Sequence, residues 1–152
     1  MACRSRTPVV RISSRQRALR VPRKRIIELV RFIARREPKP VAEVDVAVVS
    51  AQGIAALNRR WLGRRGTTDV MSFDLSGPGE AGLTAQVVVC ADVAAREGRR
   101  RHGVQRELLL YVAHGLLHLL GYDDTTPKAA AAMHACQEEL LDAFFQAKRR
   151  KR

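Results

Sequence analysis

An almost unbroken apolar run at residues 108–120 dominates the pattern of hydrophobic and polar positions along the chain. A helix that is apolar on every side is expected to be buried in the core. The run contains His114 and His118, and their spacing places both imidazoles on one face of that helix. Gly121 then supplies the residue type that most easily adopts the left-handed conformation ending a helix. The pattern predicts a central, buried helix that carries two imidazoles and then reverses direction.

Shorter periodic segments surround this central helix. Alternating or continuous apolar runs predict strands, which we expect at residues 8–13, 44–48, 69–75 and 83–90. Apolar residues spaced three and four apart predict helices, which we expect to start near Pro22, after Ser50, at Asp92, near Leu108 and at Thr126. The last two strands flank a glycine-rich turn and are expected to pair antiparallel. These elements predict an α+β domain in which a small mixed β-sheet of about four strands packs with about five helices.

Capping residues and apolar stripes orient the predicted helices. Ser50 and Asp92 are expected to cap the second and third helices through their side-chain oxygens. The second helix is expected to turn three residues inward, namely Ile54, Leu57 and Trp61. The last helix begins at Thr126 and Pro127, and its inward stripe consists of Met133, Gln137, Leu140 and Phe144. His134 lies off this stripe and is expected at the surface.

The central helix and the turn after it have the spacing of a mononuclear metal site, His-x3-His-x2-Gly-x2-Asp. The chain reversal brings a carboxylate back over the two imidazoles, where Asp124 has the better offset and Asp123 is the fallback. Three protein ligands leave one position open for water, as in catalytic zinc sites. A histidine that is only hydrogen-bonded in the core is the alternative, but burying two without partners is costly. We therefore expect one divalent metal ion, Zn²⁺, held by His114, His118 and Asp124.

Net charge indicates the class of partner. The chain has 152 residues, which suits one domain over residues 1–152, and its 28 Lys and Arg against 15 Asp and Glu give +13. Such an excess favours RNA, because neutralised phosphates release counterions. A basic surface kept only for solubility and a surface for acidic lipids are the alternatives. The candidate RNA contacts lie in the basic segment 59–68, which is expected to be flexible, and are Arg59, Arg60, Arg64 and Arg65.

Both ends of the chain are basic as well. Residues 1–27 contain no acidic residue, which predicts a basic N-terminal arm, although an organelle transit peptide has a similar composition. Residues 149–152 end a basic C-terminal tail that is expected to be a disordered, phosphate-binding extension. Cys3, Cys90 and Cys136 have no disulfide-framework spacing, so we expect a reducing, cytoplasmic location and no disulfide-linked partner. The apolar run is too short to span a bilayer, which argues against a membrane partner.

The histidine segment resembles the signature of the YbeY family, H-G-x-L-H-L-x-G-Y-D-H. The matching residues are His114, Gly115, Leu117, His118, Leu119, Gly121, Tyr122 and Asp123. Asp124 stands where the family has its third histidine. A carboxylate is still a competent zinc ligand, and two histidines with one carboxylate also suit iron.

A second family motif, L-N-x-x-Y-R-G-x-D-x-P-T-D-V-L-S-F, is similar to the middle of the chain, so that the resemblance covers residues 44–124. The matching residues are Leu57, Asn58, Gly63, Thr68, Asp69, Val70, Ser72 and Phe73. Leu62 occupies the position of an arginine that the family is thought to use in catalysis. The other departures from this motif are Trp61, Arg65 and Thr67, and further along Ala85 and Gln86 stand where the family usually has Gly-Asp or Gly-Glu. Arg59, Arg60 or Arg64 is the candidate to deliver a guanidinium to the same space.

The resemblance implies a metal-dependent endoribonuclease that cuts single-stranded RNA in ribosomal RNA maturation and ribosome quality control. Its partners are then ribosomal RNA and the small ribosomal subunit. The residues support this independently, because a three-ligand metal activates water and a basic surface attracts phosphate. A non-catalytic RNA-binding ribosome-assembly factor with a structural metal is the alternative. A zinc metalloprotease is disfavoured, because those enzymes need a glutamate where this chain has Gly115.

Overall fold

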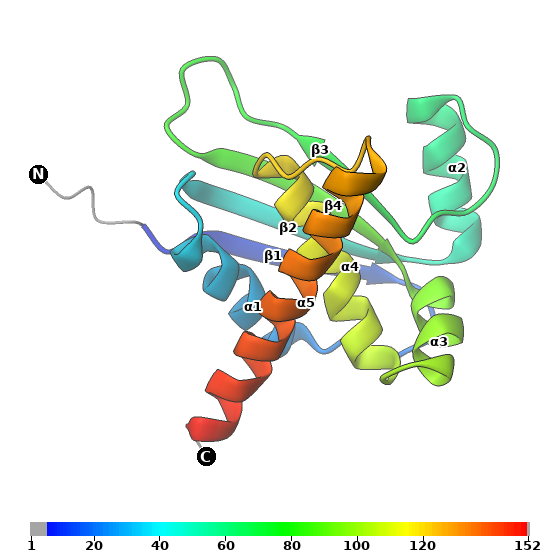
Figure 1. Ribbon diagram of the computed structural model, residues 1–152. Coiled ribbons are helices and arrows are strands. Elements are labelled where there is room, and N and C mark those ends of the chain that lie inside the picture. The colour runs from blue at the N-terminus through cyan, green and yellow to red at the C-terminus, as the bar shows by residue number, and fades with distance from the viewer. Residues whose placement is uncertain (1–5, 152) are drawn as a thin grey trace, which may run out of the picture.

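The computed structural model describes residues 6–151, so residues 1–5 of the predicted N-terminal arm and Arg152 of the predicted tail lie outside it. The strands of this part are β1 (Val9–Arg15), β2 (Val41–Val49), β3 (Val70–Asp74) and β4 (Leu83–Cys90). They form one sheet in the order β1-β2-β4-β3 (Figure 1). The first three strands in that order run parallel, and β3 pairs antiparallel with β4. The predicted mixed sheet and its antiparallel pair are confirmed.

Five helices accompany the sheet in the described residues. They are α1 (Arg23–Arg36), α2 (Ala51–Leu62), α3 (Ala91–Arg100), α4 (Val104–Leu119) and α5 (Pro127–Arg150). Helices α1, α4 and α5 lie on one side of the sheet, while α2 and α3 lie toward one end of it (Figure 1). Helix α4 contacts β3, β4 and the helices α1, α3 and α5. The predicted α+β class, with about four strands and about five helices around a central helix, therefore agrees with the structure.

Helix α4 is closed on its sheet-facing side. Leu108, Val112 and Leu116 are fully buried there or against neighbouring helices. Gly115 lies so close to the sheet that a Cβ atom on it would be 2.8 Å from Cγ1 of Val87 and 3.0 Å from Cγ2 of Val70. These distances are shorter than carbon atoms tolerate, so α4 packs closely on the sheet because residue 115 has no side chain.

The helix ends explain one confirmed and one wrong capping prediction. Ser50 caps α2, because its Oγ accepts a hydrogen bond from the Gly53 N–H at 3.1 Å. Asp92 does not cap α3, which starts after Cys90 without a side-chain cap. Its Oδ2 instead accepts a 2.6 Å hydrogen bond from the Ala51 N–H. The carboxylate therefore satisfies a free N–H group of α2 and links the two helices.

The end of α2 also differs from expectation. Arg59 and Arg60 lie in its last helical turn, not in a flexible segment. Trp61 is 60% exposed, so the prediction that it faces the core is wrong. The physical reason is position, because the C-terminal end of α2 projects away from the sheet (Figure 1), and Leu62 next to Trp61 is exposed as well.

The predicted disordered tail is helical as far as Arg150. Two contacts with α1 account for this order: Phe144 packs edge-on against Phe32 at 5.5 Å between ring centroids, and Lys148 forms an ion pair with Glu28. None of the helices in residues 6–151 has the length and apolar character needed to cross a membrane. Cys90 and Cys136 are free thiols, and Cys3 lies outside the described residues.

Candidate functional site

The turn after α4 returns the chain to the face that carries the histidines. Gly121 has φ 108°, a left-handed conformation that glycine adopts without strain. The next residue is held in place, because the Tyr122 hydroxyl donates a 3.1 Å hydrogen bond to Oε1 of Glu37 at the end of α1. Oδ2 of Asp124 then lies 3.8 Å from Nε2 of His114. The reversal predicted at Gly121 thus brings a carboxylate to an imidazole.

The three predicted metal ligands line one cavity of about 410 Å³, which we call the histidine pocket. His114 is half-buried, whereas His118 and Asp124 are exposed. The other wall residues come from α2, the segment after it and β3, and include Asn58, Leu62, Arg64, Thr68 and Ser72. The pocket is therefore an open depression whose wall contains two imidazoles, a carboxylate and a guanidinium.

The structure distinguishes between the two neighbouring carboxylates. Asp123 accepts hydrogen bonds from the N–H and Oγ1 of Thr125, at 2.9 and 2.7 Å. These hydrogen bonds lower the pKa of Asp123 and build its side chain into the turn before α5. Asp124, by contrast, lines the histidine pocket. Of the two carboxylates weighed from the sequence, Asp124 is the one positioned to act with His114.

The other ring nitrogen of His114 has a buried partner that was not identified from the sequence. Its Nδ1 lies 2.9 Å from Oε1 of Gln137, and Nε2 of that amide lies 3.2 Å from Nδ1 of His134. An amide oxygen only accepts hydrogen bonds and an amide nitrogen only donates them. In this orientation the proton of neutral His114 is on Nδ1, and the lone pair is on Nε2, facing Asp124. A polar residue within the apolar stripe of α5 is the signal that could have identified this partner, because a buried amide needs a hydrogen-bond partner.

The chemistry of this donor set fits a divalent metal ion. Two ligands of one tetrahedral zinc ion lie about 3.4 Å apart, given zinc–ligand bonds of about 2.1 Å. The 3.8 Å between Nε2 of His114 and Oδ2 of Asp124 is close to that separation. Within residues 6–151, however, no three His, Cys, Asp or Glu side chains converge on a single point as they stand. His118, on the same cavity wall, would be the third ligand of such an ion.

The four candidate arginines are separated by the structure. Arg64 alone among them lines the histidine pocket. Arg59 and Arg65 line another cavity, of about 390 Å³. The Arg60 guanidinium stacks on the Trp61 ring, 5.3 Å from the ring centroid. The structure therefore places one of the four candidate arginines beside the histidines and the other three elsewhere, and their contact with RNA stays a prediction.

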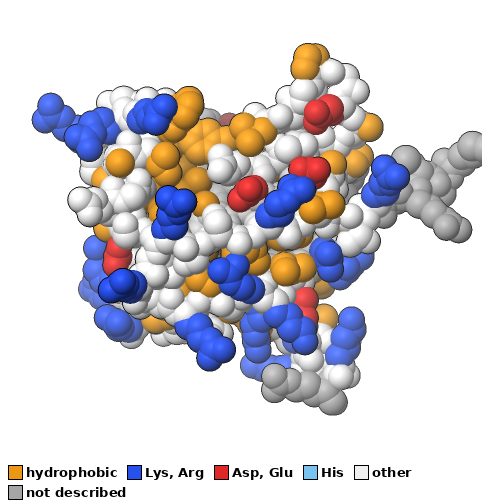
Figure 2. Space-filling model, turned by 180° about the vertical axis from the view of Figure 1, so that it is seen from behind, with side chains coloured by type: hydrophobic (Ala, Val, Ile, Leu, Met, Phe, Trp, Pro, Cys, Tyr) orange, Lys and Arg blue, Asp and Glu red, His pale blue; other side chains and the backbone are white. Residues whose placement is uncertain are grey.

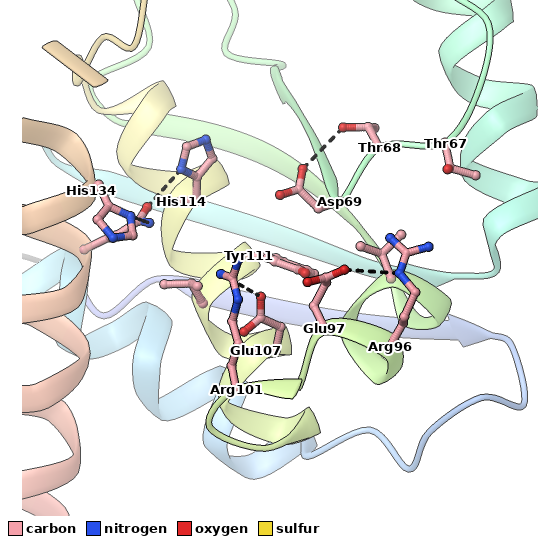
Figure 3. Close-up of a pocket in the computed structure, with 13 residues that line it drawn as sticks. Thr67, Thr68, Asp69, Arg96, Glu97, Arg101, Glu107, Tyr111, His114 and His134 are labelled. Atoms are coloured by element: carbon pink, nitrogen blue, oxygen red, sulfur yellow. Dashed lines mark hydrogen bonds and ion pairs between the residues drawn. The ribbon is translucent and has the colours of Figure 1, made fainter. Parts of the chain in front are cut away.

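A further cavity, of about 470 Å³, adjoins the histidine pocket and shares Thr68 and His114 with it. Figure 3 shows three acidic side chains along this cavity, Asp69, Glu97 and Glu107, and we call it the carboxylate pocket. Glu107, Tyr111, His114 and His118 follow one another on α4 at spacings of four, three and four residues. A single stripe of the central helix therefore supplies side chains to both cavities.

Comparison with known proteins agrees with the fold and with the motifs. A sequence model described as endoribonuclease YbeY matches residues 11–145. A protein of Nocardioides sp. named endoribonuclease YbeY is 40% identical over 80% of this chain and 88% of its own length. The corresponding protein of Rhodococcus opacus is 35% identical over 90% of this chain and 83% of its own length. The solution structure of TM1509 from Thermotoga maritima superposes with a TM-score of 0.63 at 26% identity, covering 94% of this chain and 93% of that one. The chain belongs to the YbeY family.

Proposed function

We propose that this protein is a metal-dependent endoribonuclease that cuts single-stranded RNA. One observation carries the proposal: Nε2 of His114 lies 3.8 Å from Oδ2 of Asp124, in an open pocket that Arg64 also lines. The names of the family relatives support the reaction class. One divalent ion, Zn²⁺, would be held by His114, His118 and Asp124, and would supply a water of lowered pKa and a Lewis acid for a phosphoryl oxygen.

The protein's own groups prepare this pocket for a phosphodiester. Gln137 keeps the proton of His114 on Nδ1, so that Nε2 faces the pocket as a lone-pair donor. Arg64 provides hydrogen-bond donors and a positive charge where the phosphate gains negative charge during hydrolysis. Because Leu62 lines the same pocket, we propose that Arg64 takes the role of the family arginine expected at position 62.

The surface charge suits an RNA substrate. The net charge is +13, and Figure 2 shows Lys and Arg side chains spread over the side of the sheet opposite α4, with few acidic side chains between them. Such a surface binds phosphates without reading their sequence. We propose ribosomal RNA and the small ribosomal subunit as partners, and ribosomal RNA maturation and ribosome quality control in the cytoplasm as the setting.

Peptide hydrolysis is disfavoured by the packing of α4. A metalloprotease of this motif needs a glutamate directly after the first histidine. Here that residue is Gly115, and even a Cβ atom on it would lie 2.8 Å from Val87 Cγ1. Position 115 therefore faces the sheet and has no room for a catalytic side chain.

The proposal is tested with zinc-loaded protein, chelator-treated protein and a His114→Ala variant, each incubated with single-stranded and duplex RNA. We expect zinc-dependent cleavage of the single strand and loss of cleavage in the variant, with RNA binding retained. Equal cleavage by the variant would show that the activity arises elsewhere. Binding without cleavage by the zinc-loaded protein would support the non-catalytic assembly factor instead.

A further inference from the structure

Three carboxylates gather in the carboxylate pocket of this otherwise basic protein. The pocket has a volume of about 470 Å³ and is lined by Asp69, Glu97 and Glu107, and also by Arg96 and Arg101. Arg96 forms an ion pair with Glu97, and Arg101 forms one with Glu107, so both guanidinium charges are already balanced by carboxylates, which themselves repel phosphate groups. The carboxylate pocket adjoins the histidine pocket at Thr68 and His114. An RNA strand whose phosphate lies beside His114 would therefore place an uncharged group, a base, next to these carboxylates.

Glu107 is the most buried of the three carboxylates and keeps acceptor positions for a ligand. Asp69 already accepts a 2.9 Å hydrogen bond from the Val70 N–H, and Glu97 accepts one of 3.1 Å from Arg96. Glu107 is only 4% exposed, and Nη1 of Arg101 lies 4.0 Å from its Oε1, which is beyond hydrogen-bonding distance. Two carboxylate oxygens offer about four acceptor positions. Figure 3 shows this side chain at the cavity, where a ligand with N–H groups would satisfy it.

The surroundings of Glu107 suit an aromatic ring. Tyr111, one turn further along α4, is 5% exposed and lines the same cavity. Burial and the nearby Glu107 carboxylate raise the pKa of its hydroxyl, so it remains a neutral phenol at physiological pH. Val93 and Leu110 contribute apolar side chains to the wall of this cavity. A flat base with polar edges matches such a mixture of ring, apolar side chains and carboxylate.

We propose that the carboxylate pocket binds a guanine base of the RNA strand, with the Glu107 carboxylate accepting hydrogen bonds from N1–H and from the 2-amino group. Among the four RNA bases, guanine alone presents two adjacent donors on its Watson–Crick edge. Adenine, cytosine and uracil each place an acceptor beside a donor, which a carboxylate repels. This inference rests on the proposed function, because it takes the guanine to belong to the RNA whose phosphate enters the histidine pocket.

Nucleotide binding tests the pocket without requiring cleavage. Isothermal titration calorimetry of the metal-free, full-length protein would compare GMP, IMP, AMP, CMP and UMP, which share the phosphate and differ in the base. We expect GMP to bind about tenfold more tightly than AMP, CMP or UMP, as for a bidentate contact. IMP, which lacks the 2-amino group, should fall between them. Equal affinities, or no binding of GMP, would overturn the proposal.

A Glu107→Gln variant identifies the group responsible. A side-chain amide has one donor and one acceptor, so the variant should lose the preference for GMP while melting at a similar temperature. Glu97→Gln, in the same pocket but engaged with Arg96, is the matched control and should keep the preference. A uniform loss of affinity for all five nucleotides in Glu107→Gln would indicate a structural role and contradict the proposal.

Cleavage of a random-sequence single-stranded RNA separates this inference from the proposed function. Sequencing of the product ends should show guanine enriched at one fixed position relative to the cut. Cleavage without enrichment, together with equal nucleotide affinities, would remove the guanine pocket and leave the endoribonuclease. Selective GMP binding without RNA cleavage would keep the guanine pocket and contradict the proposed endoribonuclease activity.

Discussion

The two faces of α4 (Val104–Leu119) are made by the same stretch of sequence and have different roles. The sheet-facing side is closed, with Leu108 and Val112 fully buried and Gly115 pressed against Val87. The opposite stripe, which carries His114, lines two open cavities, one with a second histidine and the other with three carboxylates. The difference shows that hydrophobic patterning identifies the face that is packed, while the chemistry depends on a few polar residues within the same apolar run.

The largest expected effect is on the open face, at His118. In a His118→Ala variant, cleavage of single-stranded RNA should fall roughly 10³-fold or more, because a bound metal ion supplies several kcal/mol of transition-state stabilisation. The melting temperature should change little, since this side chain is exposed. His102→Ala, an exposed histidine outside both cavities, is the control and should retain cleavage. Wild-type cleavage by His118→Ala would show that the open face is not the active site.

Arg64 tests whether the chemistry extends across the histidine pocket. Arg64→Ala should lower the cleavage rate by about 10²-fold, as does loss of one donor to the developing negative charge. Arg65→Ala is matched in charge and lies next in sequence, but that side chain lines another cavity, so its rate should stay near wild type. If Arg64→Ala and Arg65→Ala lowered the single-turnover cleavage rate equally, the arginines would attract RNA in general, and Arg64 would make no specific contact.

Gln137 tests how the open face is prepared for a metal ion. Gln137→Leu should weaken zinc binding by about 10- to 100-fold, as with loss of other outer hydrogen-bond partners of ligating histidines. Nitrogen-15 NMR of the metal-free protein should show that His114 no longer favours the form with its proton on Nδ1. Gln137→Glu retains an acceptor and should preserve that form. Unchanged tautomer and zinc affinity in Gln137→Leu would contradict this role.

Gly115 tests whether the sheet-facing side of α4 needs its close packing for stability. A Cβ atom at residue 115 would lie 2.8 Å from Val87 Cγ1, so Gly115→Ala should lower the free energy of unfolding by about 1–3 kcal/mol. Gly53→Ala, in helix α2, has its nearest neighbour at 3.3 Å and should change stability by less than about 1 kcal/mol. Urea denaturation measures both. A destabilisation of Gly115→Ala no larger than that of Gly53→Ala would mean that the close packing is not required.

Local sequence signals predicted much of the fold. The strands, the central helix and the turn at Gly121 follow from periodicity and from the conformational freedom of glycine, and the structure has all of them. The position of Asp124 beside His114 also follows, because it depends on a short, local reversal of the chain. These features are set by residues close together in sequence.

Other features depend on contacts between distant segments. Asp92 caps α2, from which it is separated by two strands, and Gln137 reaches His114 from another helix. Trp61 fits the inward stripe of α2, yet the helix extends beyond the sheet that would cover it. The basic C-terminal residues form a helix because α1 supplies partners. A single sequence predicts which residues need partners but not which distant residues provide them.

The central claim is that His114, His118 and Asp124 bind one metal ion on the open face of α4. Anomalous diffraction at the zinc absorption edge, from crystals of the zinc-loaded protein, tests this directly. We expect one strong peak about 2.0–2.2 Å from Nε2 of His114, a ring nitrogen of His118 and a carboxylate oxygen of Asp124. A zinc peak bound elsewhere, or no peak between the two histidines, would contradict the account.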